Sequence, residues 1–148
     1  MIRKIINIQN ILTIVTILTL GLTDSYTSAI MMQQKGSFIE SNPIISYIYN
    51  EYGFWSVITF KIFCTIILIL MIYRVQKIYK ESMYWKINGL LMSLSVFGIL
   101  GTMANMRAID NLTLVSPMQF IIIYLVMAVL FINIGDHIDR YVENKIKL

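Results

Sequence analysis

The chain has 148 residues, of which 57% are hydrophobic and 14% are charged, and its mean hydropathy is +0.72. Soluble domains carry roughly 25% charged residues, so this composition excludes a water-soluble globular protein. A single cysteine excludes an internal disulfide framework and a paired-cysteine metal or redox site. The length predicts one domain, residues 1–148, and the net charge of +4 has to be interpreted from the positions of the basic residues.

Four segments of the sequence are long and apolar enough to cross a bilayer, which predicts an all-α integral membrane protein with four transmembrane helices. These helices are expected at about residues 5–32, 54–79, 86–106 and 117–135. Ser116 stands directly before Pro117. This pair is typical of a helix start, because serine caps a helix and proline fits its first turn.

The connection between the first two helices is too long for a tight turn and too apolar for a polar loop. Within it, Asn42 precedes Pro43 and a periodic apolar pattern that runs over about residues 43–52. A helix of this length cannot cross the membrane. We therefore predict a short helix that lies at the membrane interface.

Beyond residue 135 the fourth helix is predicted to continue as a charged helical extension on the cytoplasmic side. Its apolar residues Ile138, Val142 and Ile146 are spaced four apart. Such a pattern is compatible with a solvated helix end and equally with a helix that docks on a partner.

The basic residues are distributed unequally over the two sides of the predicted bundle. Nine of them belong to the two termini and to the connection between the second and third helices: Arg3, Lys4, Arg74, Lys77, Lys80, Lys86, Arg140, Lys145 and Lys147. The opposite side has only Lys35 and Arg107. The positive-inside rule predicts that both termini are cytoplasmic, in the plasma membrane of a prokaryote. The net charge then reflects topology, and no nucleic-acid partner is expected.

Two ionisable residues fall inside the predicted membrane helices. Asp24 lies in the outer half of the first helix, and Lys61 lies about two turns below the outer end of the second. An unpaired charge at this depth costs roughly 2.5–3.5 kcal/mol, so such residues normally pair or face a wet cavity. Three interpretations remain open: an ion pair that joins two helices, a Lys61 side chain that extends to the outer interface, and a cavity in which Asp24, Glu40 and Lys61 handle a cation, a proton or a polar headgroup.

The residues around these charges form a recognisable pattern along the first two helices: Asp24, Thr27, Gly36, Glu40, Asn42, Pro43 and Lys61. This pattern resembles a family of small uncharacterised bacterial and archaeal membrane proteins that share an Asp-x-x-Thr helix, a Glu-x-Asn-Pro connection and a lysine in the second helix. Asn105 matches an asparagine that family members often carry late in the third helix. The resemblance implies that Asp24, Glu40, Asn42 and Lys61 converge, and it implies no activity. The candidate binding residues are therefore Asp24, Glu40, Asn42, Lys61 and Asn105.

Residues typical of catalytic and cofactor sites are largely missing from the sequence. The single histidine, His137, lies between Asp136 and Asp139. A charged helix end explains this group better than a metal site does. The sequence contains no phosphate-binding glycine loop and no nucleic-acid-binding motif. We expect no metal, no cofactor and no catalytic residue, and the sequence favours a protein without catalytic activity of its own.

Two functions are compatible with these features. The favoured one is an accessory or structural subunit of a larger membrane complex of the respiratory or oxygenase type, with other membrane subunits or a second copy as partners in the lipid bilayer. The alternative is a small transporter, or an ion- or lipid-headgroup-binding protein, that uses the polar residues of the outer half. In that alternative Asp24 is an anionic ligand or proton carrier and Lys61 is its charge partner.

Overall fold

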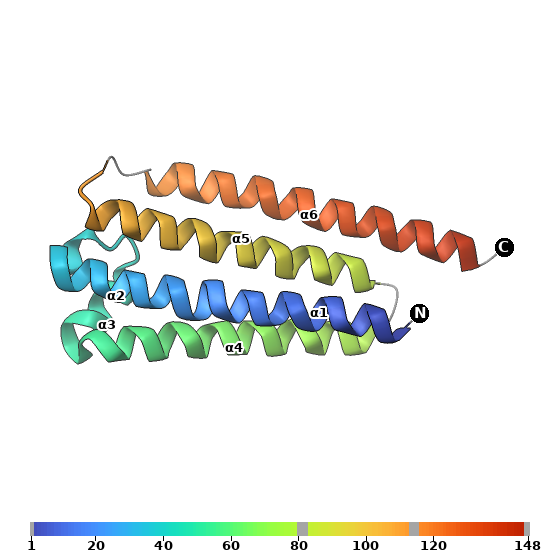
Figure 1. The fold of residues 1–148 in the computed structure, drawn as a ribbon, viewed down its shortest axis with the longest axis horizontal. Helices are drawn as coiled ribbons and strands as arrows, with labels where there is room; N and C mark the ends of the chain where they lie inside the picture. Colours follow the sequence, from blue (N-terminus) through green and yellow to red (C-terminus); the bar gives the residue numbers. More distant parts are fainter. Residues whose placement is uncertain (1, 80–82, 113–115, 147–148) are drawn as a thin grey trace.

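The computed structural model of the chain describes residues 2–79, 83–112 and 116–146. Within these ranges it is helical and contains no β-strand. The elements are α1 (Ile2–Thr16), the π-helix η1 (Ile17–Thr23), α2 (Asp24–Lys35), the 3₁₀ turn η2 (Ser37–Ile39), α3 (Pro43–Tyr52), α4 (Phe54–Tyr79), α5 (Tyr84–Ile109) and α6 (Pro117–Ile146). Figure 1 shows the long helices side by side in an elongated bundle, with both termini at one end and α3 at the other.

Four helical stretches are long and apolar enough to span a membrane, as the sequence predicts. They are Ile8–Lys35, Phe54–Tyr79, Tyr84–Ile109 and Met118–Lys145. α3 has the predicted bounds, and its N-cap is Asn42, whose side chain accepts a hydrogen bond from the Ile44 amide. Whether α3 lies at a membrane interface stays a prediction. Two of the nine basic residues used to orient the chain, Lys80 and Lys147, lie outside the described residues.

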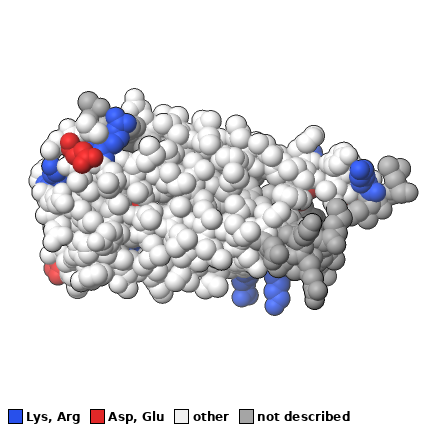
Figure 2. Space-filling view, viewed as in Figure 1, with Lys and Arg blue, Asp and Glu red and all other residues white. Residues whose placement is uncertain are grey.

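Polar side chains are buried inside the bundle beside two apolar core clusters, and apolar side chains cover much of its outside. Buried polar or charged residues among those described are Gln9, Thr16, Asp24, Ser25, Ser28, Thr65, Asn88, Ser93, Ser95 and Asp139. The outer faces of α4 and α6 expose many large apolar residues. In the view of Figure 2, charged residues lie mainly at the left end, at the right tip and at the lower edge right of the centre, and the broad white surface between them is nearly free of charge. Exposed apolar area of this extent suits a hydrocarbon surrounding and not water.

The first long apolar helical stretch is interrupted by the π-helix η1, directly before Asp24. The Asp24 amide donates to the carbonyl of Thr19, five residues earlier, as in a π-helix. At this level Gly98 of α5 lies against the η1 backbone, and a Cβ added to Gly98 would lie 2.4 Å from Leu20 N. The absence of a side chain at Gly98 therefore lets α5 contact the backbone of η1. π-Helical turns inside α-helices are rare, and many of those that occur lie at functional sites.

The predicted charged extension of the fourth helix is the second half of α6, and it docks on the start of α5 in the same chain. Asp139 accepts hydrogen bonds from the backbone amides of Trp85 (2.9 Å) and Lys86 (3.0 Å), so it caps the N-terminus of α5. Asp136 forms an ion pair with Lys86 at 2.5 Å. This cap explains why α5 begins at Tyr84, before the predicted residue 86. One face of the extension thus binds the start of α5 within the same chain, while His137 is exposed.

Replacing Asp139 with alanine is expected to destabilise the chain by about 1–2 kcal/mol, because two amides of α5 lose their acceptor. The measurement is thermal unfolding of the purified chain in detergent. His137→Ala, an exposed substitution in the same turn, is the matched control and is expected to leave the melting temperature unchanged. Equal melting temperatures for both variants would show that the cap is unimportant.

Candidate functional site

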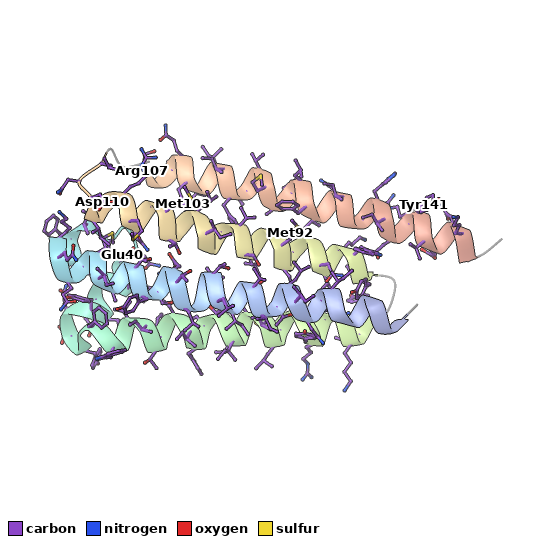
Figure 3. The ribbon with its side chains drawn as sticks, in the orientation of Figure 1. Glu40, Met92, Met103, Arg107, Asp110 and Tyr141 are labelled. Atoms are coloured by element: carbon purple, nitrogen blue, oxygen red, sulfur yellow. The ribbon has the colours of Figure 1, made fainter. Side chains whose placement is uncertain are left out.

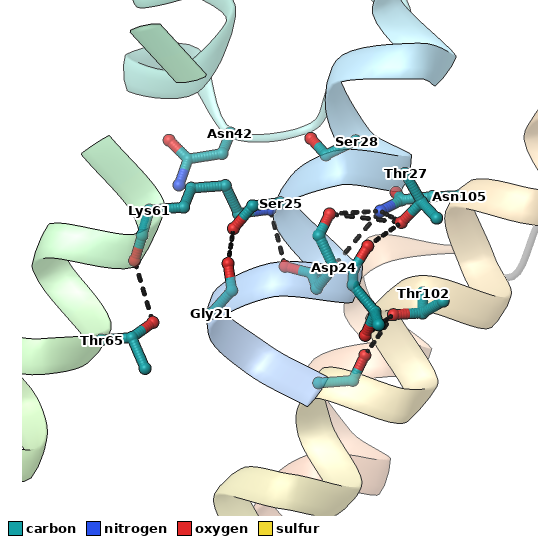
Figure 4. A network of polar contacts seen from close by, with 12 residues as sticks. Gly21, Asp24, Ser25, Thr27, Ser28, Asn42, Lys61, Thr65, Thr102 and Asn105 are labelled. Carbon is teal, nitrogen blue, oxygen red and sulfur yellow. Dashed lines mark hydrogen bonds and ion pairs between the residues drawn. The ribbon is translucent and has the colours of Figure 1, made fainter. Parts of the chain in front are cut away.

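The site is built around Asp24, the first residue of α2, which faces α4 and α5. The residue is 8% exposed. Its Oδ2 lies 2.6 Å from Nζ of Lys61 on α4, so the two charges form a direct ion pair (Figure 4). The structure therefore excludes the interpretation in which Lys61 reaches the outer interface without meeting Asp24.

Asn105 of α5 holds Asp24 from the opposite side. Its Nδ2 lies 3.2 Å from Asp24 Oδ1, 3.3 Å from the Asp24 carbonyl oxygen and 3.1 Å from Oγ1 of Thr27. Gly101, one turn before Asn105, makes room for the carboxylate, since a Cβ at this position would lie 2.4 Å from Asp24 Oδ1. Asp24 is therefore fixed by groups from α4 and α5 at once.

A second carboxylate lies next to this pair. Glu40 Oε2 accepts a hydrogen bond of 2.8 Å from the hydroxyl of Ser28, which lies one turn after Asp24 on α2 and is fully buried. Glu40 Oε1 accepts from the backbone amide of Asn42 at 2.9 Å. The charge of Glu40 lies close enough to act on Asp24. Glu40 is thereby joined to the same helix as Asp24, at the end of the bundle where Arg107 and Asp110 also lie (Figure 3).

The five residues predicted as a site thus fall into two linked groups. Asp24, Lys61 and Asn105 contact one another around one carboxylate. Glu40 is bonded to Ser28, one turn along α2 from Asp24, and the Asn42 side chain caps α3 instead of pointing its oxygen at the ion pair. The connection between the first two helices therefore positions Glu40, and Asn42 stabilises that connection.

Sequence reasoning missed Ser28 and Gly101 as members of the site. Both show a signal once Asp24 and Asn105 are chosen: Ser28 follows Asp24 by four residues and Gly101 precedes Asn105 by four, so each lies on the same helix face as its partner. Thr102 was not singled out either, although its hydroxyl meets that of Thr23 at 3.1 Å next to the site.

The chemistry that this arrangement can perform follows from its charges and donors. The Asp24 carboxylate faces the ammonium group of Lys61, and the nearby Glu40 carboxylate acts electrostatically on Asp24. Asp24 Oδ2 contacts the ammonium directly, and carboxylate oxygens are among the ligands that hard cations prefer. The group is suited to hold a small cation or a proton in place of the lysine ammonium. Over the described residues, no three histidine, cysteine, aspartate or glutamate side chains gather as a metal site. The carboxylates beside His137 are engaged with α5.

The match to a protein family covers the part of the chain that builds this site. Residues 15–111 of the 148 match a family described as a domain of unknown function (DUF5658). The chain belongs to the DUF5658 family. All five predicted site residues of this DUF5658 protein lie within the match, whereas α6 lies outside it. No curated protein and no solved structure matches the chain.

Membership of DUF5658 agrees with the predicted relationship to an uncharacterised family. The bacterial or archaeal origin of the chain stays a prediction. Since the family carries no assigned activity, a function for this DUF5658 protein has to be argued from the geometry of its own residues.

Proposed function

We propose that this DUF5658 protein is a small ion-handling membrane protein that binds a cation or a proton at Asp24, with the Lys61 ammonium as a tethered competitor. The observation that carries the proposal is the 2.6 Å pair between Asp24 and Lys61, set in a polar cluster that three helices assemble inside an apolar bundle. Its location is the plasma membrane of a prokaryote, with both termini cytoplasmic and the site in the outer half, as the distribution of basic residues predicts.

Holding two helices together does not by itself account for this ion pair. The desolvation of two charges offsets most of their attraction, so apolar residues of similar volume join helices equally well or better. Ionisable residues retained at membrane depth generally mark ion or proton pathways. The placement of Glu40 and Asn105 supports this interpretation, since Glu40 adds a second carboxylate near Asp24 and the Asn105 amide donates to the Asp24 carboxylate.

In the proposed cycle the ammonium of Lys61 occupies the Asp24 carboxylate in the resting state. When a proton or small cation arrives, Lys61 Nζ moves away and the carboxylate takes the new charge. Asn105 and Thr27 keep Asp24 in place during the exchange, because the Asn105 amide bonds both residues. Release returns Lys61 to Asp24 and restores the resting pair.

Ion flux through liposomes that contain the purified full chain tests the proposal. Proton- and sodium-sensitive dyes inside the liposomes report the flux, and the Asp24→Asn/Lys61→Met double variant is expected to reduce it to the level of empty liposomes. The matched control removes the second interhelical ion pair, by Lys86→Met together with Asp136→Asn, and is expected to retain the flux. Wild-type flux equal to that of empty liposomes, or flux that survives the loss of Asp24, would overturn the proposal.

A second candidate function is the accessory subunit that the sequence favours, and α6 supplies the observation for it. This helix packs mainly along α5 and leaves most of its apolar surface exposed. A shallow apolar depression follows α6, lined by Leu125, Val126, Val129, Leu130, Asn133 and Ile134. Light scattering of the protein extracted in mild detergent tests this candidate. A lone monomer, together with a gene deletion that alters no membrane complex, contradicts it.

A further inference from the structure

Polar contacts join the first membrane helix to its neighbours well below Asp24, toward the end of the bundle that holds the termini. The amides of Gln9 and Gln76 bond each other reciprocally, with Gln76 Nε2 2.9 Å from Gln9 Oε1. One turn further along α1, the hydroxyls of Thr13 and Tyr73 lie 3.0 Å apart. Each such pair of bonded side chains on two neighbouring helices is called a rung below. The first two rungs connect α1 with α4 near the end of the bundle that holds the termini.

The next rung connects α1 with α5. The hydroxyls of Thr16 and Ser95 lie 2.8 Å apart, and both residues are buried. Gln9, Thr13 and Thr16 follow one another at intervals of four and three residues, so successive rungs are about 4.5–6 Å apart at 1.5 Å per residue. A water molecule is able to bridge a gap of this size.

Asn88 of α5 lies beside this row. It precedes Ser95 by seven residues, two helical turns, and therefore belongs to the same face of α5. Asn88 is 4% exposed, and neither its Oδ1 nor its Nδ2 has a hydrogen-bond partner among the described residues. Buried amides are normally bonded, and an internal water makes about three hydrogen bonds to otherwise unsatisfied groups.

Polar groups also continue from the Thr16–Ser95 rung up to the ion pair. Thr65 of α4 is buried and faces Gly21, since a Cβ added to Gly21 would lie 3.5 Å from the Thr65 methyl group. The Thr65 hydroxyl donates to the carbonyl of Lys61 at 2.9 Å. Ser25, the neighbour of Asp24, is fully buried and donates to the Gly21 carbonyl. Gln9 and Asp24 are about 22 Å apart along the helix, so these rungs extend through most of a hydrocarbon core.

We infer that Asn88 binds one of several internal waters and that these waters join the polar rungs into a proton path from the inner end of the bundle to Asp24. The inference rests on the proposed function and names the proton as the cation that the site exchanges. Along the path, each water or hydroxyl accepts a proton on its oxygen and gives its own proton to the next, so one O–H bond forms and one breaks at every step. The last step protonates the Asp24 carboxylate, which becomes neutral as Lys61 Nζ leaves it.

Asn88→Leu tests the path, because leucine has similar volume and no polar atoms. Proton flux into liposomes is driven by a potassium gradient with valinomycin and is read by an internal pH dye. The variant is expected to lose Asp24-dependent proton flux while it remains at least as stable as the wild type, since it removes an unsatisfied buried amide. Asn133→Leu, the same exchange on the exposed face of α6, is the matched control and is expected to keep the flux.

A second measurement needs no variant. Water-edited solid-state NMR of the full chain in lipid is expected to show transfer of magnetisation from water to the side-chain amide of Asn88. Absence of this transfer overturns the inference, as does a proton flux that Asn88→Leu leaves unchanged. If wild-type flux is itself missing or independent of Asp24, the proposed function fails instead, and the NMR measurement still decides whether Asn88 holds water.

Discussion

Replacing Lys61 with methionine is expected to destabilise the chain by about 3 kcal/mol, and adding Asp24→Asn to the same molecule is expected to restore most of that loss. The single substitution leaves the Asp24 carboxylate buried without its counter-charge, 2.6 Å from where the ammonium stood. The double variant removes both charges, and a neutral amide at position 24 still bonds Asn105. The physical reason is that a buried unpaired charge costs more than the intact pair contributes.

The measurement is a double-mutant cycle by chemical unfolding of the purified chain in mixed micelles. Lys35→Met is the control, because Lys35 is bonded to the neutral side chain of Asn111 near the surface. That variant is expected to change the free energy of unfolding by less than about 0.5 kcal/mol. If the double variant is as unstable as the sum of the single variants, the two side chains are not energetically coupled and the pair is not the centre of the site.

Stability and activity are expected to separate in the same cycle. The double variant recovers stability while its ion flux stays at the level of empty liposomes, because neither the ligand nor its competitor remains. A purely structural pair gives the opposite result: a stable double variant that functions normally. The double-mutant cycle thus distinguishes an ion pair that only joins two helices from a site at which an ion replaces Lys61. It needs no assumption about which ion is transported.

Gly98→Val is expected to cost about 3 kcal/mol of stability, at the upper end of overpacking effects, and to reduce flux as well. A Cβ at residue 98 would lie 2.4 Å from Leu20 N and 2.6 Å from Thr19 C. Both atoms belong to the backbone of η1, so no side-chain rotation relieves the contact and α5 has to move away. The movement separates Asn105 on α5 from Asp24, because Asp24 directly follows η1 in the chain.

Thermal unfolding in detergent and liposome flux check this expectation together. Met92→Phe adds volume on the exposed side of the same helix and is expected to change neither quantity. A Gly98→Val variant with wild-type stability would show that α5 and η1 separate easily. The contact at Gly98 would then not be what positions the site.

Much of the architecture is determined by the sequence alone, because apolar length is a local property of the chain. The four helices long and apolar enough to cross a membrane follow from runs of apolar residues. The bounds of α3 follow from Asn42, Pro43 and the apolar period after them. Asp24 and Lys61 were identifiable as partners from the sequence, because a charge inside an apolar run usually pairs with an opposite charge or faces a polar cavity.

Other features depend on which helices meet, and only the tertiary structure decided them. The π-helix before Asp24 is formed where Gly98 lets α5 touch the backbone. The early start of α5 depends on Asp139, more than fifty residues away. The unsatisfied amide of Asn88 has no signal in the sequence, since an asparagine in an apolar helix looks the same whether or not a partner faces it. Local hydrophobicity fixes where helices begin and end, whereas the partners of a buried polar group are set by contacts between segments that are distant in the chain.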